Sequence, residues 1–337
     1  EQDEISANGY ALELRLYAED PANDFLPVTG KILQWETPAM DGLRIESAVE
    51  TGSEVSVFYD PMIAKLVVHG EDRTRAFRKM AYLLENLQCL GITTNREFLL
   101  RLIQDESVQE GAYNTHFLND FDLNPAPLSV SETHIALSVA ALTSWQERES
   151  QRSLLANIPS GWRNSDYQAQ KVQLRIKETE YTFQYRRQGD TFEVQVGEWS
   201  ETVRLVRGGG SSALLDIGES LRTIPFVWDG NTIYQLLAGR SVAVEVLPRF
   251  PERQSEVEKG GLITPMPCQV LKILVKPGQA VEKGDPVAVL VSMKMENTLQ
   301  SDISGTVEEV YVEEGQNLEA GVLLMKLTDD IKPRAKT

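Results

Sequence analysis

The sequence predicts a multidomain, mainly β protein made of three successive parts. Apolar and polar residues alternate along many short runs, which indicates half-buried strands, whereas helical periodicity is confined to a few runs. A length of 337 residues suits two or three domains that each bury a core. We expect an α+β domain over residues 1–120, a helix plus antiparallel β-barrel over 121–255, and a flattened β-sandwich over 256–330.

Composition and charge narrow the possible function classes. A net charge of −17 argues against nucleic-acid binding, because no basic face is available to neutralise phosphates. No apolar run approaches the roughly 20 residues of a membrane span, so we expect no membrane insertion. The two cysteines, Cys89 and Cys268, lie far apart and the three histidines show no ligand spacing, so we expect no bound metal and a reducing compartment. The opening residues do not resemble a natural start, so we expect the chain to be the C-terminal part of a longer protein.

The first part combines strand-like runs with two helical patterns. Asp72 is a suitable N-cap for a helix that runs to about residue 87, and Thr94 with Glu97 forms the pattern of a capping box that would open a second helix. A strand over residues 11–17 would project Glu13 and Arg15 on one face, so Arg15 is either a structural ion-pair partner or a functional cation. The other strands are expected over residues 30–35, 42–48, 54–58 and 63–69.

The middle part reads as one helix followed by about eight strands. The helix over residues 131–145 is apolar over a broad face, as a helix enclosed by other structure would be. Eight alternating runs between residues 171 and 247 then suggest an antiparallel barrel around or beside this helix. The Gly208–Gly210 run is followed by no strand-to-helix phosphate motif, so we interpret it as a hairpin turn or loop.

The last part contains an internal repeat with Lys294 at its midpoint. Val270 and Val307, like Gly278 and Gly315, are separated by the same 37 positions, so one unit of short strands is used twice. The link between the two units is expected to form a tight hairpin at one tip of the sandwich. An exposed turn lysine with a pKa near about 10.4 is the simplest interpretation of Lys294. Its flanking Met293 and Met295 are unusual for a solvated turn and favour a functional role.

Residues 262–328 resemble a biotinyl carrier domain, whose attachment motif is Met-Lys-Met, here Met293, Lys294 and Met295. The resemblance implies that a biotin protein ligase attaches biotin to Lys294 as a side-chain amide. The chain departs from the family pattern at Val291-Ser292, where an acidic and then a small residue are usual, and at Cys268, where glycine is usual. The first departure bears on ligase recognition, so a docking module that is never biotinylated stays open as an alternative.

Residues 9–118 resemble the C-terminal domain of biotin carboxylases, through ELRLYAEDP at 13–21, FLP at 25–27 and YDPMIAKL at 59–66. The resemblance implies that Arg15 is catalytic: a charged planar donor that faces the ureido oxygen of biotin and stabilises its enolate. It places Arg44 at a face through which some biotin carboxylases pair. No motif of the ATP-grasp half can be identified, so ATP and Mg or Mn would bind only in the full-length subunit. We expect this chain to be inactive alone.

The middle part resembles, more weakly, the domain that docks the biotin-containing subunit of acyl-CoA carboxylases on its carboxyltransferase subunit. The similarity lies in residues 158–164 and 248–251. Within the first run, Trp162 and Arg163 are either interface anchors or residues that pack on their own barrel.

Together these resemblances imply the biotin-containing α subunit of an acyl-CoA carboxylase, a ligase, most similar to the methylcrotonyl-CoA type of leucine degradation. The propionyl- and acetyl-CoA types stay open. Carboxybiotin on Lys294 would swing on a tether over residues 253–261 to a carboxyltransferase (β) subunit that binds the acyl-CoA, in a hetero-oligomer of the bacterial cytoplasm or mitochondrial matrix. A decarboxylase or pyruvate-type carboxylase would need a carboxyltransferase barrel of well over about 200 residues, for which residues 121–255 are too short.

Overall fold

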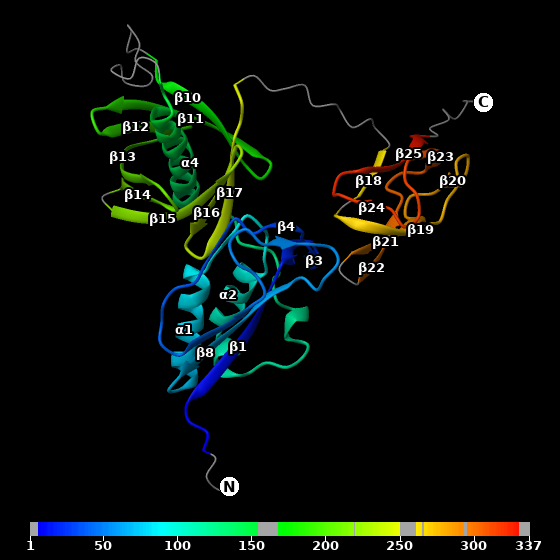
Figure 1. The fold of residues 1–337 in the computed structure, drawn as a ribbon, viewed down its shortest axis with the longest axis horizontal. Coiled ribbons are helices and arrows are strands. Elements are labelled where there is room, and N and C mark those ends of the chain that lie inside the picture. The colour runs from blue at the N-terminus through cyan, green and yellow to red at the C-terminus, as the bar shows by residue number, and fades with distance from the viewer. Residues whose placement is uncertain are drawn as a thin grey trace, which may run out of the picture.

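The computed structural model describes residues 6–153, 168–218, 220–249, 261–264, 266–292 and 295–329. It is mainly β, and the predicted fold class is confirmed. The apolar cores follow the order of the chain: one core uses residues 10–123, a second uses residues 128–246, and two small ones use residues 262–327. Figure 1 shows these parts in blue to cyan, in green to yellow and in orange to red.

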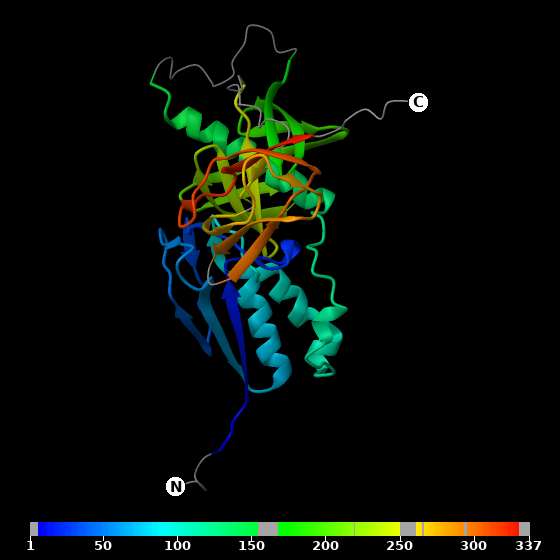
Figure 2. The same cartoon turned by 90° about the vertical axis from the view of Figure 1, so that its right-hand side faces the viewer.

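The first part is built on a three-stranded antiparallel sheet in the order β1 (Tyr10–Tyr17), β8 (Met62–Gly70) and β6 (Leu43–Ser47). Apolar residues of one face, such as Leu16, Leu66 and Val68, are buried under α1 (Arg73–Asn86) and α2 (Arg96–Gln104). Figure 2 shows the helices on one side of these strands. The opposite face of the sheet, which carries the charged residues of each strand, is therefore left outside this core.

Shorter elements complete this part, and one of them differs from the strand prediction made from the sequence. The single strand expected over residues 30–35 is two strands, because Ile32 N donates to Ser53 O (2.8 Å) and Leu33 N to Leu90 O (2.8 Å), so the chain changes partner. The remaining elements are β2 (Glu19–Asp20), η2 (Pro21–Asn23), β3 (Leu26–Pro27), β4 (Gly30–Lys31), β5 (Gln34–Glu36), β7 (Glu54–Val55), β9 (Gln88–Leu90), α3 (Glu106–Glu110) and η3 (Phe117–Asn119).

The two predicted helix starts have different outcomes. Asp72 caps α1 as expected, and its side chain accepts from Arg75 N at 2.7 Å. The capping box at Thr94 is wrong, because α2 begins at Arg96 after an N-cap, Asn95, that makes no side-chain capping bond. The Asn95 amide instead bonds to strand β1, so a long-range contact has replaced the local one.

The second part is a closed eight-stranded barrel with α4 (Val130–Ser150) inside it, as predicted. A capping box of Ser129 and Glu132 starts the helix, and Ile135, Leu142 and Trp145 are buried against the strands. The strands are β10 (Gln170–Ile176), β11 (Thr179–Gln188), β12 (Thr191–Val196), β13 (Trp199–Gly209), β14 (Ser212–Ile217), β15 (Ser220–Asp229), β16 (Thr232–Leu237) and β17 (Arg240–Val246). The Gly208–Gly210 run lies at the β13–β14 hairpin, which confirms the turn interpretation.

The barrel meets the first part at the β16–β17 hairpin. The Arg240 side chain, 16% exposed, pairs with Glu97 of α2 (3.2 Å) and Glu132 of α4 (3.9 Å). It also donates to the carbonyls of Ala126 and of Pro127 (3.2 Å) in the linker. Gly239 has φ +79°, and a Cβ there would lie 2.9 Å from Leu100 Cδ2, so the hairpin and α2 are in close contact.

The last part is a sandwich of two four-stranded sheets, ordered β18-β25-β23-β20 and β22-β21-β19-β24. The two units of the repeat bond reciprocally: Gly278 N donates to Val307 O (2.8 Å), and Gly315 N donates to Val270 O (2.7 Å). The strands are β18 (Gly261–Ile263), β19 (Cys268–Ile273), β20 (Ala280–Val281), β21 (Pro286–Ser292), β22 (Met295–Gln300), β23 (Gly305–Val310), β24 (Asn317–Leu318) and β25 (Leu323–Asp329).

Candidate functional site

Arg15 lies near the end of β1 on the solvent-facing side of the sheet. It pairs in register with Lys65 of β8, and its side chain is 59% exposed. Its alternation with the buried Leu16 places the guanidinium outside the core, as the sequence predicted.

Buried Asn95 holds the backbone of this strand end in place. Its Oδ1 accepts from Tyr17 N (3.0 Å), its Nδ2 donates to Arg15 O (3.3 Å), and its own N–H donates to Tyr17 O (3.1 Å). These three hydrogen bonds from one buried residue hold the backbone of Arg15 and Tyr17 at the end of β1. The sequence pointed to this segment only as a helix start, because a bond across 80 positions leaves no local pattern.

The ion pair between Arg15 and Glu13 exists but is weak. Arg15 Nε lies 3.8 Å from Glu13 Oε1, and the Glu13 side chain is 46% exposed. Solvent screens such a pair, whose contribution to stability is at most about 1 kcal/mol. Within the part of the chain that the structure describes, the Arg15 side chain makes no other hydrogen bond or ion pair, and it is 59% exposed, so its guanidinium can reach a ligand.

The neighbouring charges of this face pair among themselves. Lys65 Nζ lies 3.3 Å from Glu46 Oε2, and Arg44 Nη2 lies 3.4 Å from Glu46 Oε1. Lys65 and Arg44 thus share one carboxylate of β6, which agrees with a structural role for Lys65.

The loop before β8 is ordered by Asp60, whose Oδ1 accepts from Met62 N at 3.0 Å. Tyr59 in the same loop is exposed. Burial and, second, the negative charge of Asp60 raise the pKa of Glu19. Asp60 therefore acts on the local turn and on Glu19, as expected of a structural residue.

The second candidate site is the hairpin between β21 and β22. Ser292 and Met295 are a paired register position at the ends of these strands, so Met293 and Lys294 stand between them in the sequence. Met293, Lys294 and the Met295 side chain lie outside the described residues, as do Trp162 and Arg163. The strand pairing agrees with the predicted tight hairpin.

Ser292 is a residue of this site whose contribution the sequence did not reveal. It is 1% exposed, and its Oγ donates to Pro267 O at 2.8 Å. The bond connects the end of β21 to the segment that enters β19, so it anchors one side of the hairpin. Val291, which belongs to the same departure from the family pattern as Ser292, pairs with Gln269 and with Glu296.

A metal centre is not visible in the described ranges, where no three His, Cys, Asp or Glu residues cluster. Of the helices that the model describes, none has the length and apolar character needed to cross a membrane.

Three family models match successive segments of the chain. They are the biotin carboxylase C-terminal domain over residues 13–120, the BT domain of the methylcrotonyl-CoA carboxylase α subunit over 133–249, and a domain of biotin-requiring enzymes over 260–327. The chain therefore carries the domains of a biotin-dependent carboxylase subunit, and the family recognised from the sequence is confirmed.

Two kinds of carboxylase α subunit are among its relatives. The mouse mitochondrial methylcrotonoyl-CoA carboxylase subunit alpha is 32% identical over 93% of this chain and 46% of its own length. The human mitochondrial propionyl-CoA carboxylase alpha chain is 30% identical over 97% of this chain and 47% of its own. The chain thus spans about half the length of the curated relatives it matches. A Campylobacter jejuni biotin carboxylase structure matches 36% of this chain and 27% of its own, at 37% identity and a TM-score of 0.35.

Proposed function

We propose that this chain supplies one wall of a biotin carboxylation site, a docking domain and a biotin carrier within an acyl-CoA carboxylase α subunit. The three domains would span residues 1–120, 121–255 and 256–330. The observation that carries the proposal is Met-Lys-Met placed between the paired Ser292 and Met295 of a repeated sandwich. The same chain presents an anchored, accessible arginine on a carboxylase-type sheet.

The residues present fit the bound group that this function requires. Biotin on Lys294 would supply the ureido nitrogen that takes up and releases a carboxyl group. Arg15 would stabilise the negative charge on the ureido oxygen when this nitrogen loses its proton, because a guanidinium stays charged and presents fixed donors. Asn95 would hold the Arg15 backbone through the hydrogen bond to its carbonyl, so little reorganisation is needed during the reaction.

The remaining components of the reaction would lie outside this chain. ATP and Mg or Mn would bind in the ATP-grasp half of the full-length subunit, and the chain alone would be inactive. A carboxyltransferase (β) subunit would bind the acyl-CoA and receive the carboxyl group, and a biotin protein ligase would modify Lys294. The enzyme would be of the methylcrotonyl-CoA type of leucine degradation or of the propionyl-CoA type, because relatives of both types match the chain. It would lie in the mitochondrial matrix, as these mitochondrial relatives suggest, or in the bacterial cytoplasm.

The first test is modification of Lys294. The chain is co-expressed with a biotin protein ligase, and intact mass and streptavidin binding are measured beside Lys294→Ala. We expect one added biotin that is absent in the variant. An unmodified chain beside an active ligase would favour the docking-module alternative, for which the Val291-Ser292 departure is the supporting feature.

The substrate type is tested in the full-length subunit. Candidate carboxyltransferase subunits are co-purified with it, and ATP-dependent carboxylation of methylcrotonyl-CoA and propionyl-CoA is compared. The substrate with the larger kcat/KM assigns the type, and activity with neither would contradict the proposed acyl-CoA class.

A further inference from the structure

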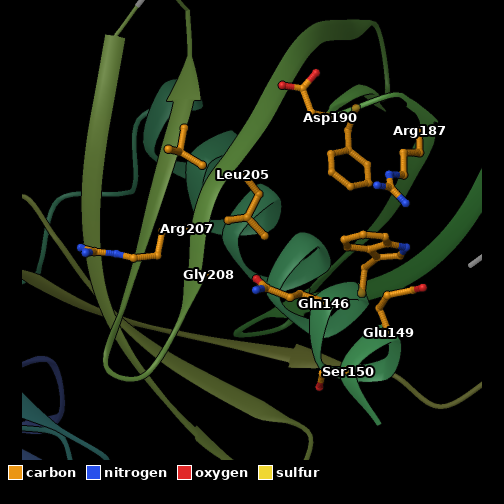
Figure 3. A pocket seen from close by; sticks show the side chains of 11 residues that line it. Gln146, Glu149, Ser150, Arg187, Asp190, Leu205, Arg207 and Gly208 are labelled. Atoms are coloured by element: carbon orange, nitrogen blue, oxygen red, sulfur yellow. The ribbon is translucent and has the colours of Figure 1, made fainter. Parts of the chain in front are cut away.

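A cavity of about 400 Å³ opens at the end of the barrel where α4 finishes. Gln146 and Glu149 of α4, Arg187 of β11 and Gly208 of β13 line it, as Figure 3 shows. Its volume falls in the range of about 300–1,000 Å³ that is usual for small-molecule sites. Neither candidate site described above contains any of these residues.

Three buried polar atoms on the lining residues have no hydrogen-bond partner among the described residues: Trp145 Nε1, Gln146 Oε1 and Glu149 Oε2. Trp145 is only 8% exposed, so its indole N–H is removed from bulk water. The other oxygen of Glu149 already accepts from Arg152 Nη2 at 2.7 Å. Buried polar groups in native proteins almost always have a hydrogen-bond partner. One donor and two acceptors without partners around one cavity therefore indicate a binding site for a ligand.

The walls of the cavity suit a compact ring. The Trp145 ring meets the edge of Phe192 at 5.0 Å, and the Arg187 guanidinium lies 5.0 Å from the centre of the same indole. Leu205 adds apolar surface from β13, where a register irregularity between Leu205 and Arg207 interrupts the strand. A Cβ at Gly208 would lie 2.2 Å from Gln146 Oε1, so glycine leaves room for the Gln146 amide beside the cavity.

A cyclic urea is the complement of these groups. Its carbonyl oxygen accepts one hydrogen bond from an indole N–H, and its two N–H groups donate to an amide oxygen and a carboxylate. A fused apolar ring would contact the aromatic and aliphatic wall. We propose that this cavity is a resting site for the ureido ring of the biotin that the chain itself carries. This inference rests on the proposed attachment of biotin to Lys294.

The chain leaves the barrel at the end where this cavity opens. Arg240 contacts Glu132 near the start of α4, so β17 begins at that end and its last residue, Val246, lies toward the end where α4 finishes. Burial raises the pKa of the Tyr185 hydroxyl, and the positive charges of Arg148 and Arg249 oppose that rise. Tyr185 in turn lies 6.1 Å from the cavity residue Phe192. Arg249 is the last described residue before the connection to the carrier.

The connection is long enough for the carrier to return. Residues 250–260 span at most roughly 40 Å when extended, to which the length of the carrier is added. A short connection gives an effective concentration on the order of millimolar, so a site with millimolar affinity for free biotin amide would still be occupied about half of the time. Such a site would hold the ring away from solvent between reactions.

The first experiment titrates Nε-biotinyl-lysine into the Lys294→Ala chain and follows the heat of binding by isothermal titration calorimetry. We expect saturable binding that weakens about tenfold in Trp145→Phe, which keeps the ring but loses the donor, and similarly in Glu149→Gln. Trp199→Phe is the matched control, because Trp199 stacks on His134 near the other end of the barrel and should leave binding unchanged. Binding that is absent, or equal in all variants, would overturn the site.

A second titration with acetamide separates biotin from other amides. We expect it to bind at least tenfold more weakly, because acetamide has neither of the two fused rings and makes few apolar contacts. Acetamide that binds as tightly as the biotin amide would overturn the assignment to biotin.

A third experiment measures the rate at which avidin captures the biotinylated chain. We expect capture to be about twofold or more faster in Trp145→Phe than in the unaltered chain and in Trp199→Phe, because a docked ring is hidden from avidin. Equal rates would contradict intramolecular docking. A chain that is never biotinylated would instead overturn the proposed function, whereas the free-probe titration would still decide the site.

Discussion

The two connections between the three parts of this chain differ in kind. Between the first part and the barrel, one largely buried arginine, Arg240, bonds two carboxylates and two linker carbonyls, and Gly239 packs against α2. Between the barrel and the carrier stand residues 250–260, of which five are charged. The cores of the carrier are formed by its own residues alone.

The two kinds of connection therefore have different consequences: one fixes the distance between two domains, and the other sets how often two domains meet. A junction closed by buried polar contacts fixes a distance, so the Arg15 face keeps its place relative to the barrel. A polar connection instead sets an effective concentration through its length. In the proposed enzyme, the docking domain and the carboxylation face would therefore stay together while the carrier travels.

The largest effect is expected in the first part of the chain, where a change at Arg15 should alter the rate of biotin carboxylation. In the full-length subunit, Arg15→Ala should lower the rate of biotin carboxylation by about 10²–10³-fold, since it removes a donor to a developing negative charge. The measurement is ATP-dependent carboxylation of biotin, with intact mass to verify that biotin addition to Lys294 is unchanged.

Glu13→Gln is the control for that change, because it removes the partner of the exposed ion pair and leaves Arg15 in place. We expect a rate within about twofold of the unaltered subunit. A loss as large as that of Arg15→Ala would mean that the ion pair, and not the guanidinium alone, is required.

The second effect tests the junction itself. Arg240→Met should lower the free energy of unfolding of the barrel by about 2–4 kcal/mol, because Glu97, Glu132 and two carbonyls lose a shared donor. Urea unfolding and hydrogen exchange in residues 124–129 measure it. Arg204→Ala, which removes an exposed pair with Asp216 (2.7 Å), should cost less than about 1 kcal/mol. Equal costs would show that Arg240 is an ordinary surface residue.

The third effect is expected in the carrier, at Ser292. Ser292→Ala should destabilise the carrier by about 1 kcal/mol and slow biotin addition, because the hydrogen bond to Pro267 O anchors the hairpin. Ser301→Ala is the matched variant: its buried hydroxyl donates to Ile303 O at 2.6 Å, away from the hairpin. Ligase kinetics should separate the two, and equal slowing would refute a specific role for Ser292.

The smallest effect is a pH dependence within the barrel. Burial lowers the pKa of His134 below its ordinary 6.5, and the ring stacks on Trp199 at 4.1 Å. As the pH falls, the unfolded chain takes up this proton at a higher pH than the folded chain does. The contribution of neutral His134 to the free energy of unfolding is therefore fully present above pH 6.5, and it is lost as the pH falls from 6.5 toward the folded-state pKa. The unfolding midpoint measured between pH 7.5 and 5.5 should show a smaller decrease in His134→Phe. An unchanged decrease would assign it to other groups.

Local patterns were enough to predict much of this fold. Strict alternation identified the barrel strands, because each strand has one face on α4 and one in solvent, and the broad apolar surface of α4 indicated a helix enclosed by other residues. The 37-residue offset predicted the paired units of the carrier, whose bonds between Gly278 and Val307 and between Gly315 and Val270 repeat at that offset.

Contacts between distant segments could not be predicted in this way. Asn95 matched a helix start, but its amide bonds to Arg15 and Tyr17, and Arg240 bonds to residues more than 100 positions away. The predicted capping box at Thr94 is not formed, because Thr94 Oγ1 accepts from Arg96 N at 3.4 Å and Asn95, not Thr94, is the N-cap. Lys294 shows the opposite case: its motif is evident in the sequence, whereas its geometry lies outside the described residues.

The repeat in the carrier also relates its hairpin at residues 293–294 to the two ends of the domain. Position 294 is related by the 37-residue offset to positions 257 and 331, next to which the carrier begins at β18 and ends at β25. In Figure 1 these two strands lie on the upper side of the carrier, and β22 lies on the lower side. A seven-residue strand such as β21 is roughly 20 Å long. In the proposed function, biotin on Lys294 would therefore lie at the end of the domain opposite its two chain ends, and the length of the folded domain would add to the reach of the connection.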